Sequence, residues 1–135
     1  MVLKIRSQHL EKIFQHAKKC YPLEACGILV GRVEEEGRIV TKVYHTKNVL
    51  ESSSSYQIDP IEQLRVFEEA ERNGLDVLGF YHSHPLWDSF WSKADEEASK
   101  LWEGYVFLII SLKTLATNAY IRKQDSIEKE DIAII

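Results

Sequence analysis

The stretch FYHSHPLWDSFWSKADEE, from Phe80 to Glu97, decides how this chain is organised. It begins with the end of a largely apolar run, Asp76–His84, which predicts a strand. Pro85 follows at once and ends that strand, because proline has no backbone N–H to donate to a sheet. Ser92 and, three residues later, Asp95 are typical of a helix start. The sequence therefore predicts a strand tip, a short loop and the first turn of a helix in close succession.

Two histidines stand at the tip of this predicted strand. Side chains two positions apart on a strand point to the same face, so His82 and His84 project together while Ser83 faces the other way. Two imidazoles on one face can bind one metal ion. A pair of histidines on a strand can also be two unrelated, hydrogen-bonded side chains, and the pattern alone leaves both interpretations open.

Asp95 supplies a third candidate ligand. A carboxylate with two imidazoles makes a three-ligand site and leaves a fourth tetrahedral position for water. Asp95 is also explained without a metal, as the third helical residue of an acidic capping box begun by Ser92. The two interpretations are compatible, because a helix that begins just past the strand directs its first turn back toward the histidines.

Glu24 is the candidate for proton transfer. Hydrolysis by a metal-activated water needs a group that takes the proton of the water and passes it on. Glu24 lies in YPLEACGILVG, where a strand begins, and a glutamate is an unusual choice among such apolar neighbours. The alternative is an exposed carboxylate at the end of a strand.

The remaining elements follow from periodicity and from turn residues. Helices are predicted at residues 7–19, with Ser7 as N-cap, from about Pro60 to Asn73–Gly74, and at 92–103. In the second helix Leu64, Phe67 and Ala70 form the expected buried stripe. Strands are predicted at 25–33, 39–48, 76–84, 105–112, 115–123 and 127–135. We expect an α/β or α+β fold, with a mixed sheet of roughly six strands flanked by three helices.

Composition narrows the possible functions. The 135 residues favour one domain, 1–135, with 44% hydrophobic and 28% charged residues. A net charge of −4 argues against nucleic acid as a partner. Cys20 and Cys26 are interpreted as buried or half-buried thiols, and neither a signal peptide nor a membrane span is recognisable. We therefore expect a cytoplasmic protein without a membrane partner.

These residues together resemble the JAMM motif of MPN-domain metalloproteases. The motif has a distant glutamate, the sequence H-[ST]-H-P, seven residues to a serine and two more to an aspartate. Glu24, His82-Ser83-His84, Ser92 and Asp95 fit every spacing. PLEACGILVG and the later residues Asn48, Asp59 and Pro60 also match, so the resemblance covers essentially the whole chain.

The resemblance implies an MPN-type fold, related to that of cytidine deaminases, in which a curved, barrel-like mixed sheet lies between helices. It implies a zinc isopeptidase that cuts between the C-terminal glycine of a ubiquitin-like modifier and a target lysine, as in single-domain archaeal members. His82, His84 and Asp95 would then bind Zn²⁺ and an activated water. Glu24 would move the proton to the leaving amine, and Ser92 would stabilise the oxyanion.

Other functions stay open at this point. A hydrolase of sulfur-carrier protein conjugates or small peptides would use the same residues, and some relatives are non-catalytic scaffolds. The chain departs from the family at Trp91, where proline usually precedes the serine. The aromatic loop PLWDSFW forms either a wall for substrate or a packing and dimer surface, and a homodimer is not excluded.

Overall fold

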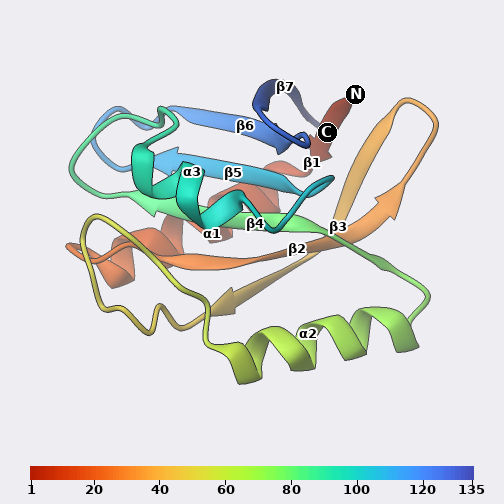
Figure 1. The fold of residues 1–135 in the computed structure, drawn as a ribbon, viewed down its shortest axis with the longest axis horizontal. Coiled ribbons are helices and arrows are strands. Elements are labelled where there is room, and N and C mark those ends of the chain that lie inside the picture. Colours follow the sequence, from red (N-terminus) through yellow and green to blue (C-terminus); the bar gives the residue numbers. More distant parts are fainter.

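The computed structural model describes all 135 residues as seven strands and three helices (Figure 1). In chain order they are β1 (Val2–Ile5), α1 (Ser7–Cys20), β2 (Cys26–Val33), β3 (Gly37–Thr46), α2 (Pro60–Arg72), β4 (Asp76–His84), α3 (Lys93–Ser99), β5 (Val106–Ser111), β6 (Thr117–Arg122) and β7 (Ile127–Ile134). No helix is long and apolar enough to cross a membrane.

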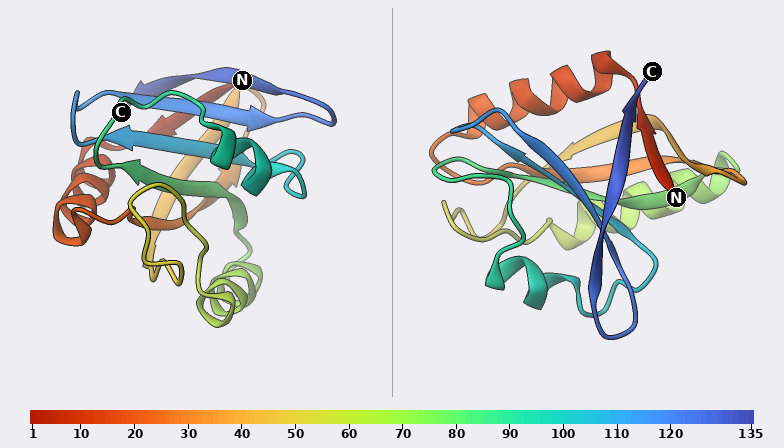
Figure 2. Two further views of the ribbon diagram at one scale, coloured as in Figure 1. Left: turned by 60° about the vertical axis from the view of Figure 1, so that its left-hand side comes forward. Right: turned by 90° about the horizontal axis from the view of Figure 1, so that it is seen from above.

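The seven strands form one mixed sheet that closes on itself in the order β1-β3-β2-β4-β5-β6-β7. β1 closes the barrel because it pairs in parallel with β3 on one side and with β7 on the other. β4 and β5 form the remaining parallel pair, and the other neighbours are antiparallel. The crossed strands of the barrel are clearest in the two turned views (Figure 2). The predicted curved mixed sheet is thus present, in closed form.

The helices cover opposite faces of the sheet. Ile13 and Ala17 of α1 belong to a core with Leu29 and Leu108. Val66 and Ala70 of α2 belong to a second core on the other face of the same strands, which also contains Ile28, Phe80 and Phe107. α2 runs below the sheet in Figure 1, and α3 lies in front of it. β5, buried along its whole length, is the predicted central strand covered on both faces.

The sequence located most elements correctly. Residues 76–84 form β4 as predicted, the third helix is capped by Ser92, and the closing strand is β7. Gly74, with φ +66°, ends α2 as expected. α2 begins where Asp59 accepts a hydrogen bond from the amide of Ile61 at 2.9 Å, with Pro60 as the first helical residue.

Four predictions about elements are wrong. β1 was missed, because four residues before a helix show too little alternation to indicate a strand. Ser7 is the first residue of α1 and Arg6 occupies the N-cap position, without a side-chain cap. Leu64 is 59% exposed, since Val66 takes its place on the buried face of α2 beside the correctly predicted Ala70. α3 ends at Ser99, four residues earlier than predicted.

Candidate metal centre

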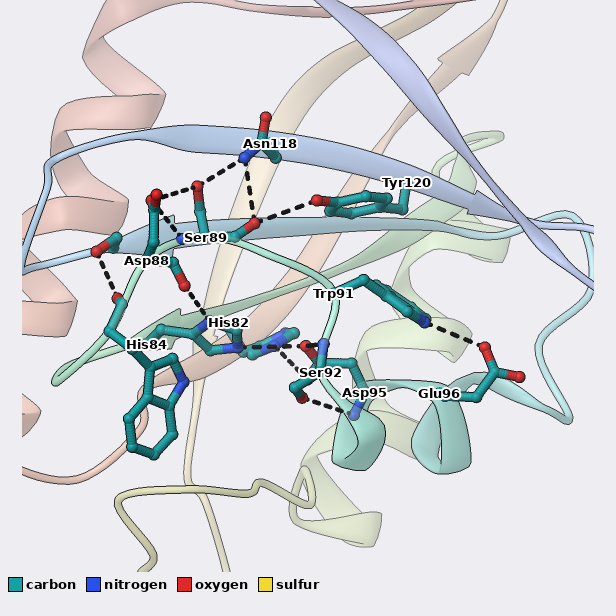
Figure 3. A network of polar contacts seen from close by, with 12 residues as sticks. His82, His84, Asp88, Ser89, Trp91, Ser92, Asp95, Glu96, Asn118 and Tyr120 are labelled. Carbon is teal, nitrogen blue, oxygen red and sulfur yellow. Dashed lines mark hydrogen bonds and ion pairs between the residues drawn. The ribbon is translucent and has the colours of Figure 1, made fainter.

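β4 presents its histidines to one side, at the end of the strand nearest α3. From Phe80 onward the side chains alternate, so Phe80 packs in the core beneath α2 and Tyr81 in the core beneath α1. His82 and His84 continue the alternation on the Phe80 side, and their ring centroids are 5.2 Å apart. Both rings are almost completely buried. The expected common orientation of the two histidines is therefore present (Figure 3).

Asp95 meets both imidazoles. Its Oδ1 lies 2.8 Å from His82 Nε2 and its Oδ2 lies 3.2 Å from His84 Nε2. One ligand atom from each of the three residues falls within 4.8 Å of the others. Burial by itself would raise the pKa of Asp95, but the two histidines and the Ser92 amide outweigh it and hold that pKa well below its usual range. The group is thus a carboxylate.

Asp95 also closes the capping box of α3. The Ser92 hydroxyl accepts a hydrogen bond from the Asp95 amide at 3.1 Å, and Asp95 Oδ2 accepts one from the Ser92 amide at 3.0 Å. The capping-box interpretation of Asp95 is therefore confirmed, and the same geometry is compatible with its interpretation as a metal ligand. The capping bond orients the carboxylate toward the histidines, because it fixes the side chain against its own helix start.

The outer nitrogens of the two rings have different surroundings. His84 Nδ1 is 2.7 Å from the backbone carbonyl of Asp88, an acceptor that requires a proton on Nδ1. That tautomer leaves the lone pair of His84 on Nε2, the atom that faces Asp95. His82 Nδ1 has no hydrogen-bond partner, and the ring is held instead by stacking on Tyr56, with centroids 4.4 Å apart.

Glu24 is buried beside this cluster, with 2% of its surface exposed, so the alternative of an exposed strand-end carboxylate is wrong. Its Oε1 has no hydrogen-bond partner. Burial, and secondarily the charge of Asp95, raises the pKa of Glu24 to about 9. The two carboxyl groups thus have pKa values displaced in opposite directions, a pattern that is typical of acid–base sites.

The backbone around Glu24 is tied to two neighbouring segments. Its amide donates to the carbonyl of Ser52 at 2.8 Å, and its carbonyl accepts from Asn48 Nδ2 at 3.1 Å. The next residue, Ala25, donates its amide to Ser83 Oγ at 2.8 Å. Ser83 therefore faces away from the cluster and supports the backbone, as its position on the strand predicted.

The aromatic loop between β4 and α3 is buried in one part and exposed in another. Trp91 packs inward, 5.1 Å from the ring of Tyr120 and 5.7 Å from that of Phe107, and donates to Glu96 at 3.1 Å. Leu86 and Phe90 are instead 44% and 51% exposed. The packing interpretation is thus confirmed for Trp91, whereas the exposed Leu86 and Phe90 stay compatible with a substrate wall or a dimer surface.

The donor set fits a borderline divalent cation such as zinc. Two imidazole nitrogens and one carboxylate are a common three-ligand set in catalytic zinc sites. Neither His82 Nε2 nor His84 Nε2 makes a regular hydrogen bond, although both are buried next to a carboxylate. Buried nitrogen lone pairs without a donor are unfavourable unless a cation or a proton occupies the space between them.

Comparison with known proteins decides the family. Residues 6–124 match the family described as prokaryotic homologs of the JAB domain, Prok-JAB. This chain belongs to the Prok-JAB family. The match includes all five sequence-predicted site residues, Glu24 before β2 as well as the four between β4 and the start of α3, and it confirms the resemblance inferred from their spacing.

Individual Prok-JAB relatives and a solved structure agree with this assignment. The desampylase of Haloferax volcanii is 37% identical over 114 residues, covering 81% of this chain and 80% of its own length. The CysO-cysteine peptidase of Mycobacterium bovis is 33% identical over 94 residues, covering 70% of this chain and 63% of its own length. The solution structure of protein DSY2949 from Desulfitobacterium hafniense has a TM-score of 0.89 at 30% identity, over 98% of this chain and 92% of that chain.

Sequence analysis missed the residues around the predicted ligands. Tyr56, which stacks on His82, lies in a serine-rich loop without periodicity. The Asp88 carbonyl is a backbone atom, so no residue type indicates its contact with His84. Asn118 and Tyr120 reach the loop from β6, and a spacing of about thirty residues carries no local signal. Only the alternation of β6 side chains offered a hint, because it places these two residues on one face.

Proposed function

We propose that this chain is a zinc-dependent isopeptidase that cleaves the bond between the C-terminal glycine of a ubiquitin-like modifier and a lysine of its target. The observation that carries the proposal is the convergence of His82, His84 and Asp95 within 4.8 Å, beside the buried carboxyl group of Glu24. The desampylase name of a relative that is 37% identical supports the substrate class.

His82 and His84 would bind the metal through their Nε2 atoms and Asp95 through its carboxylate. When bound, zinc supplies positive charge for the scissile carbonyl and lowers the pKa of a water from ~15.7 to about 7. Burial of the whole cluster strengthens these electrostatic effects, because few water molecules screen the charges.

Glu24 is the proton carrier in this proposal. In the metal-free site the raised pKa of about 9 keeps the Glu24 carboxyl group protonated at neutral pH. A cation on the neighbouring ligands would lower that pKa and leave a carboxylate that can accept a proton from the attacking water. The carboxyl group then delivers that proton to Nζ of the departing lysine, which would otherwise leave as an unstable amide anion. The hydrogen bonds from Asn48 and to Ser52 keep the Glu24 backbone in place during both transfers.

Ser92 is assigned the role of oxyanion donor. Its hydroxyl already accepts a hydrogen bond from the Asp95 amide, which leaves the hydroxyl proton free to donate. Because this hydroxyl is already fixed at the start of a helix, little free energy is needed to orient it when negative charge develops on the substrate oxygen.

Apolar surface beside the cluster fits a protein substrate with an extended terminal segment. Phe90 and Trp87 place their rings 5.7 and 6.1 Å from the ring of His84, edge to face. On the other side Tyr56, which stacks on His82, also lines a pocket of about 450 Å³ with Leu50, Ile58 and Trp102. Apolar walls of this kind bind an extended peptide segment by burying its apolar surface rather than by pairing with its charges.

A second substrate class is favoured by the relative named CysO-cysteine peptidase. Release of an amino acid from the C-terminus of a small sulfur-carrier protein breaks the same kind of amide bond. It would use the same roles for Glu24 and Ser92, with the α-amine of the amino acid as leaving group.

The deciding experiment is a cleavage assay on a panel of substrates. It contains ubiquitin-like modifiers joined to lysine through an isopeptide bond, linear fusions, and modifiers extended by one amino acid, each incubated with added zinc or with chelator. Chelator-sensitive cleavage of the isopeptide set supports the first proposal, and cleavage of the extended modifiers alone supports the second. No cleavage of either set, or cleavage that chelator leaves unchanged, would refute both.

A further inference from the structure

The loop from Pro85 to Trp91 is held by its backbone carbonyls. The Ser111 hydroxyl donates to the Trp87 carbonyl at 2.6 Å. Asn118 Nδ2 and the Tyr120 hydroxyl both donate to the Ser89 carbonyl, at 3.2 and 3.3 Å. These donors come from β5 and β6, so the sheet itself fixes a loop that has no secondary structure of its own.

Asp88 lies at the centre of this arrangement. Its Oδ1 accepts hydrogen bonds from the Ser89 amide at 2.7 Å and from the Thr114 hydroxyl at 2.8 Å. The Ser89 hydroxyl, which is fully buried, accepts from Asn118 Nδ2 at 2.7 Å and is 3.4 Å from the same Oδ1. The hydrogen bonds form a chain with one direction, in which Asn118 donates to the Ser89 hydroxyl and that hydroxyl donates to the Asp88 carboxylate (Figure 3).

The Asp88 carbonyl is the acceptor for His84 Nδ1, at 2.7 Å. A metal-binding histidine needs its other nitrogen protonated and oriented, and the acceptor for that proton fixes both the tautomer and the ring plane. His82 has no such acceptor, since its Nδ1 is unpartnered. The orientation of the His84 ring therefore depends on where the loop places one carbonyl oxygen.

We infer that Asp88, Ser89 and Asn118 form a positioning network that presents the Asp88 carbonyl to His84 and thereby sets the tautomer of this metal ligand. The inference rests on the proposed metal site, but the tautomer itself is a property of the metal-free protein. The three residues act through the orientation of the His84 ring, so they are positioning residues.

The variants follow from the direction of the hydrogen bonds. Asn118→Ala removes the donor to Ser89, and Asp88→Ala removes the carboxylate that accepts from Ser89 and Thr114. Asp88→Asn is the conservative counterpart, because its amide oxygen still accepts those bonds. Thr117→Val, a similar substitution on β6 outside the network, is the matched control. The Asp88 side chain is exposed, so its substitutions do not disturb the core.

Two readouts test the network. The first is zinc affinity, measured by competition with a chromophoric chelator. Asn118→Ala and Asp88→Ala should bind zinc about 10–100-fold more weakly, whereas Asp88→Asn and Thr117→Val should stay within about threefold of wild type. The second is the His84 tautomer in metal-free protein, read from long-range ¹H–¹⁵N correlations of the ring. Wild type should show a proton fixed on Nδ1, and the two alanine variants a mixture of tautomers.

The outcomes separate the inference from the proposed function. Unchanged zinc affinity and an unchanged His84 tautomer in both alanine variants would overturn the network and leave the isopeptidase proposal standing. If the wild-type protein binds no zinc but the two alanine variants still show the tautomer change, the proposed zinc site is overturned and the network stands.

Discussion

Ser92 and Asp95 hydrogen-bond each other in both directions at the start of α3, at 3.1 and 3.0 Å. The carboxylate that closes this box also contacts His82 and His84. A single side chain thus stabilises the first turn of a helix and completes the candidate metal site. Ser92 is thus both a helix cap and the candidate oxyanion donor, and a useful experiment has to separate the two roles.

Ser92→Ala and Ser92→Gly make that separation. Loss of an N-cap serine costs about 1 kcal/mol when alanine replaces it but only a few tenths when glycine does. Loss of an oxyanion donor costs ~10²–10³ in kcat, whichever residue replaces the serine. We expect both variants to lose turnover equally and only the alanine variant to unfold earlier in urea. If turnover instead follows stability, the hydroxyl serves only as a cap.

Glu24→Gln tests the proton carrier. Glutamine fills the same buried space and cannot accept a proton, so turnover should fall by ~10²–10⁴ while zinc content, measured by metal analysis, stays at the wild-type level. Glu103→Gln, a neutralisation of an exposed glutamate that follows α3, is the matched control and should retain full activity. Wild-type turnover in the Glu24 variant would remove this residue from the mechanism.

The site was more predictable from sequence than its surroundings were. His82, His84 and Asp95 are separated by fixed numbers of residues on a strand, a loop and a helix start, and local geometry determines where such residues point. Glu24 was singled out by its unusual place among apolar neighbours and by its fit to the JAMM pattern. Its burial could not be predicted, because its backbone is held by Asn48 and Ser52 in a loop more than twenty residues away.

The elements that escaped prediction are those whose stability comes from tertiary contacts. β1 is too short to show a strand-like alternation of apolar and polar residues. It is a strand because it pairs in parallel with β3 on one side and with β7 on the other. Leu64 follows the helical period, yet the rotation of α2 on the sheet buries Val66 instead. Packing overrides periodicity wherever several apolar residues compete for one face.

Zinc should stabilise the folded protein through the three ligands. A ligand that binds only the native state raises the free energy of unfolding by about 2.7 kcal/mol at a free concentration one hundred times its Kd. We expect the melting temperature of wild-type protein to rise when zinc is added after chelator treatment, and that of His82→Ala to stay constant. His9→Ala, on α1, should respond like wild type. An equal rise in the His82 variant would place the zinc elsewhere.

A separate pair of histidines gives the protein a pH-dependent stability. His16 Nδ1 and His45 Nδ1 each lie 2.7 Å from the Tyr81 hydroxyl, and the two rings are 4.4 Å apart. Burial, the neighbouring His45 and Lys19 lower the pKa of His16 to about 4. Burial and nearby lysines also lower the pKa of His45. Protonation of either ring is therefore unfavourable in the folded state.

The sign of the effect follows from these lowered pKa values. An unfolded histidine takes up its proton near pH 6.5, whereas folded His16 resists protonation until about pH 4, so the unfolded state gains protons first as the pH falls. Stability from this group is complete above pH 6.5 and declines between about 6.5 and 4. Urea denaturation of chelator-treated protein at pH 7.5 and 4.5 should show a smaller decline for His16→Gln than for wild type. Lys19→Gln, which removes one of the charges that lower both pKa values, should give an intermediate decline. Equal declines in all three proteins would show that this pair titrates normally in the folded state.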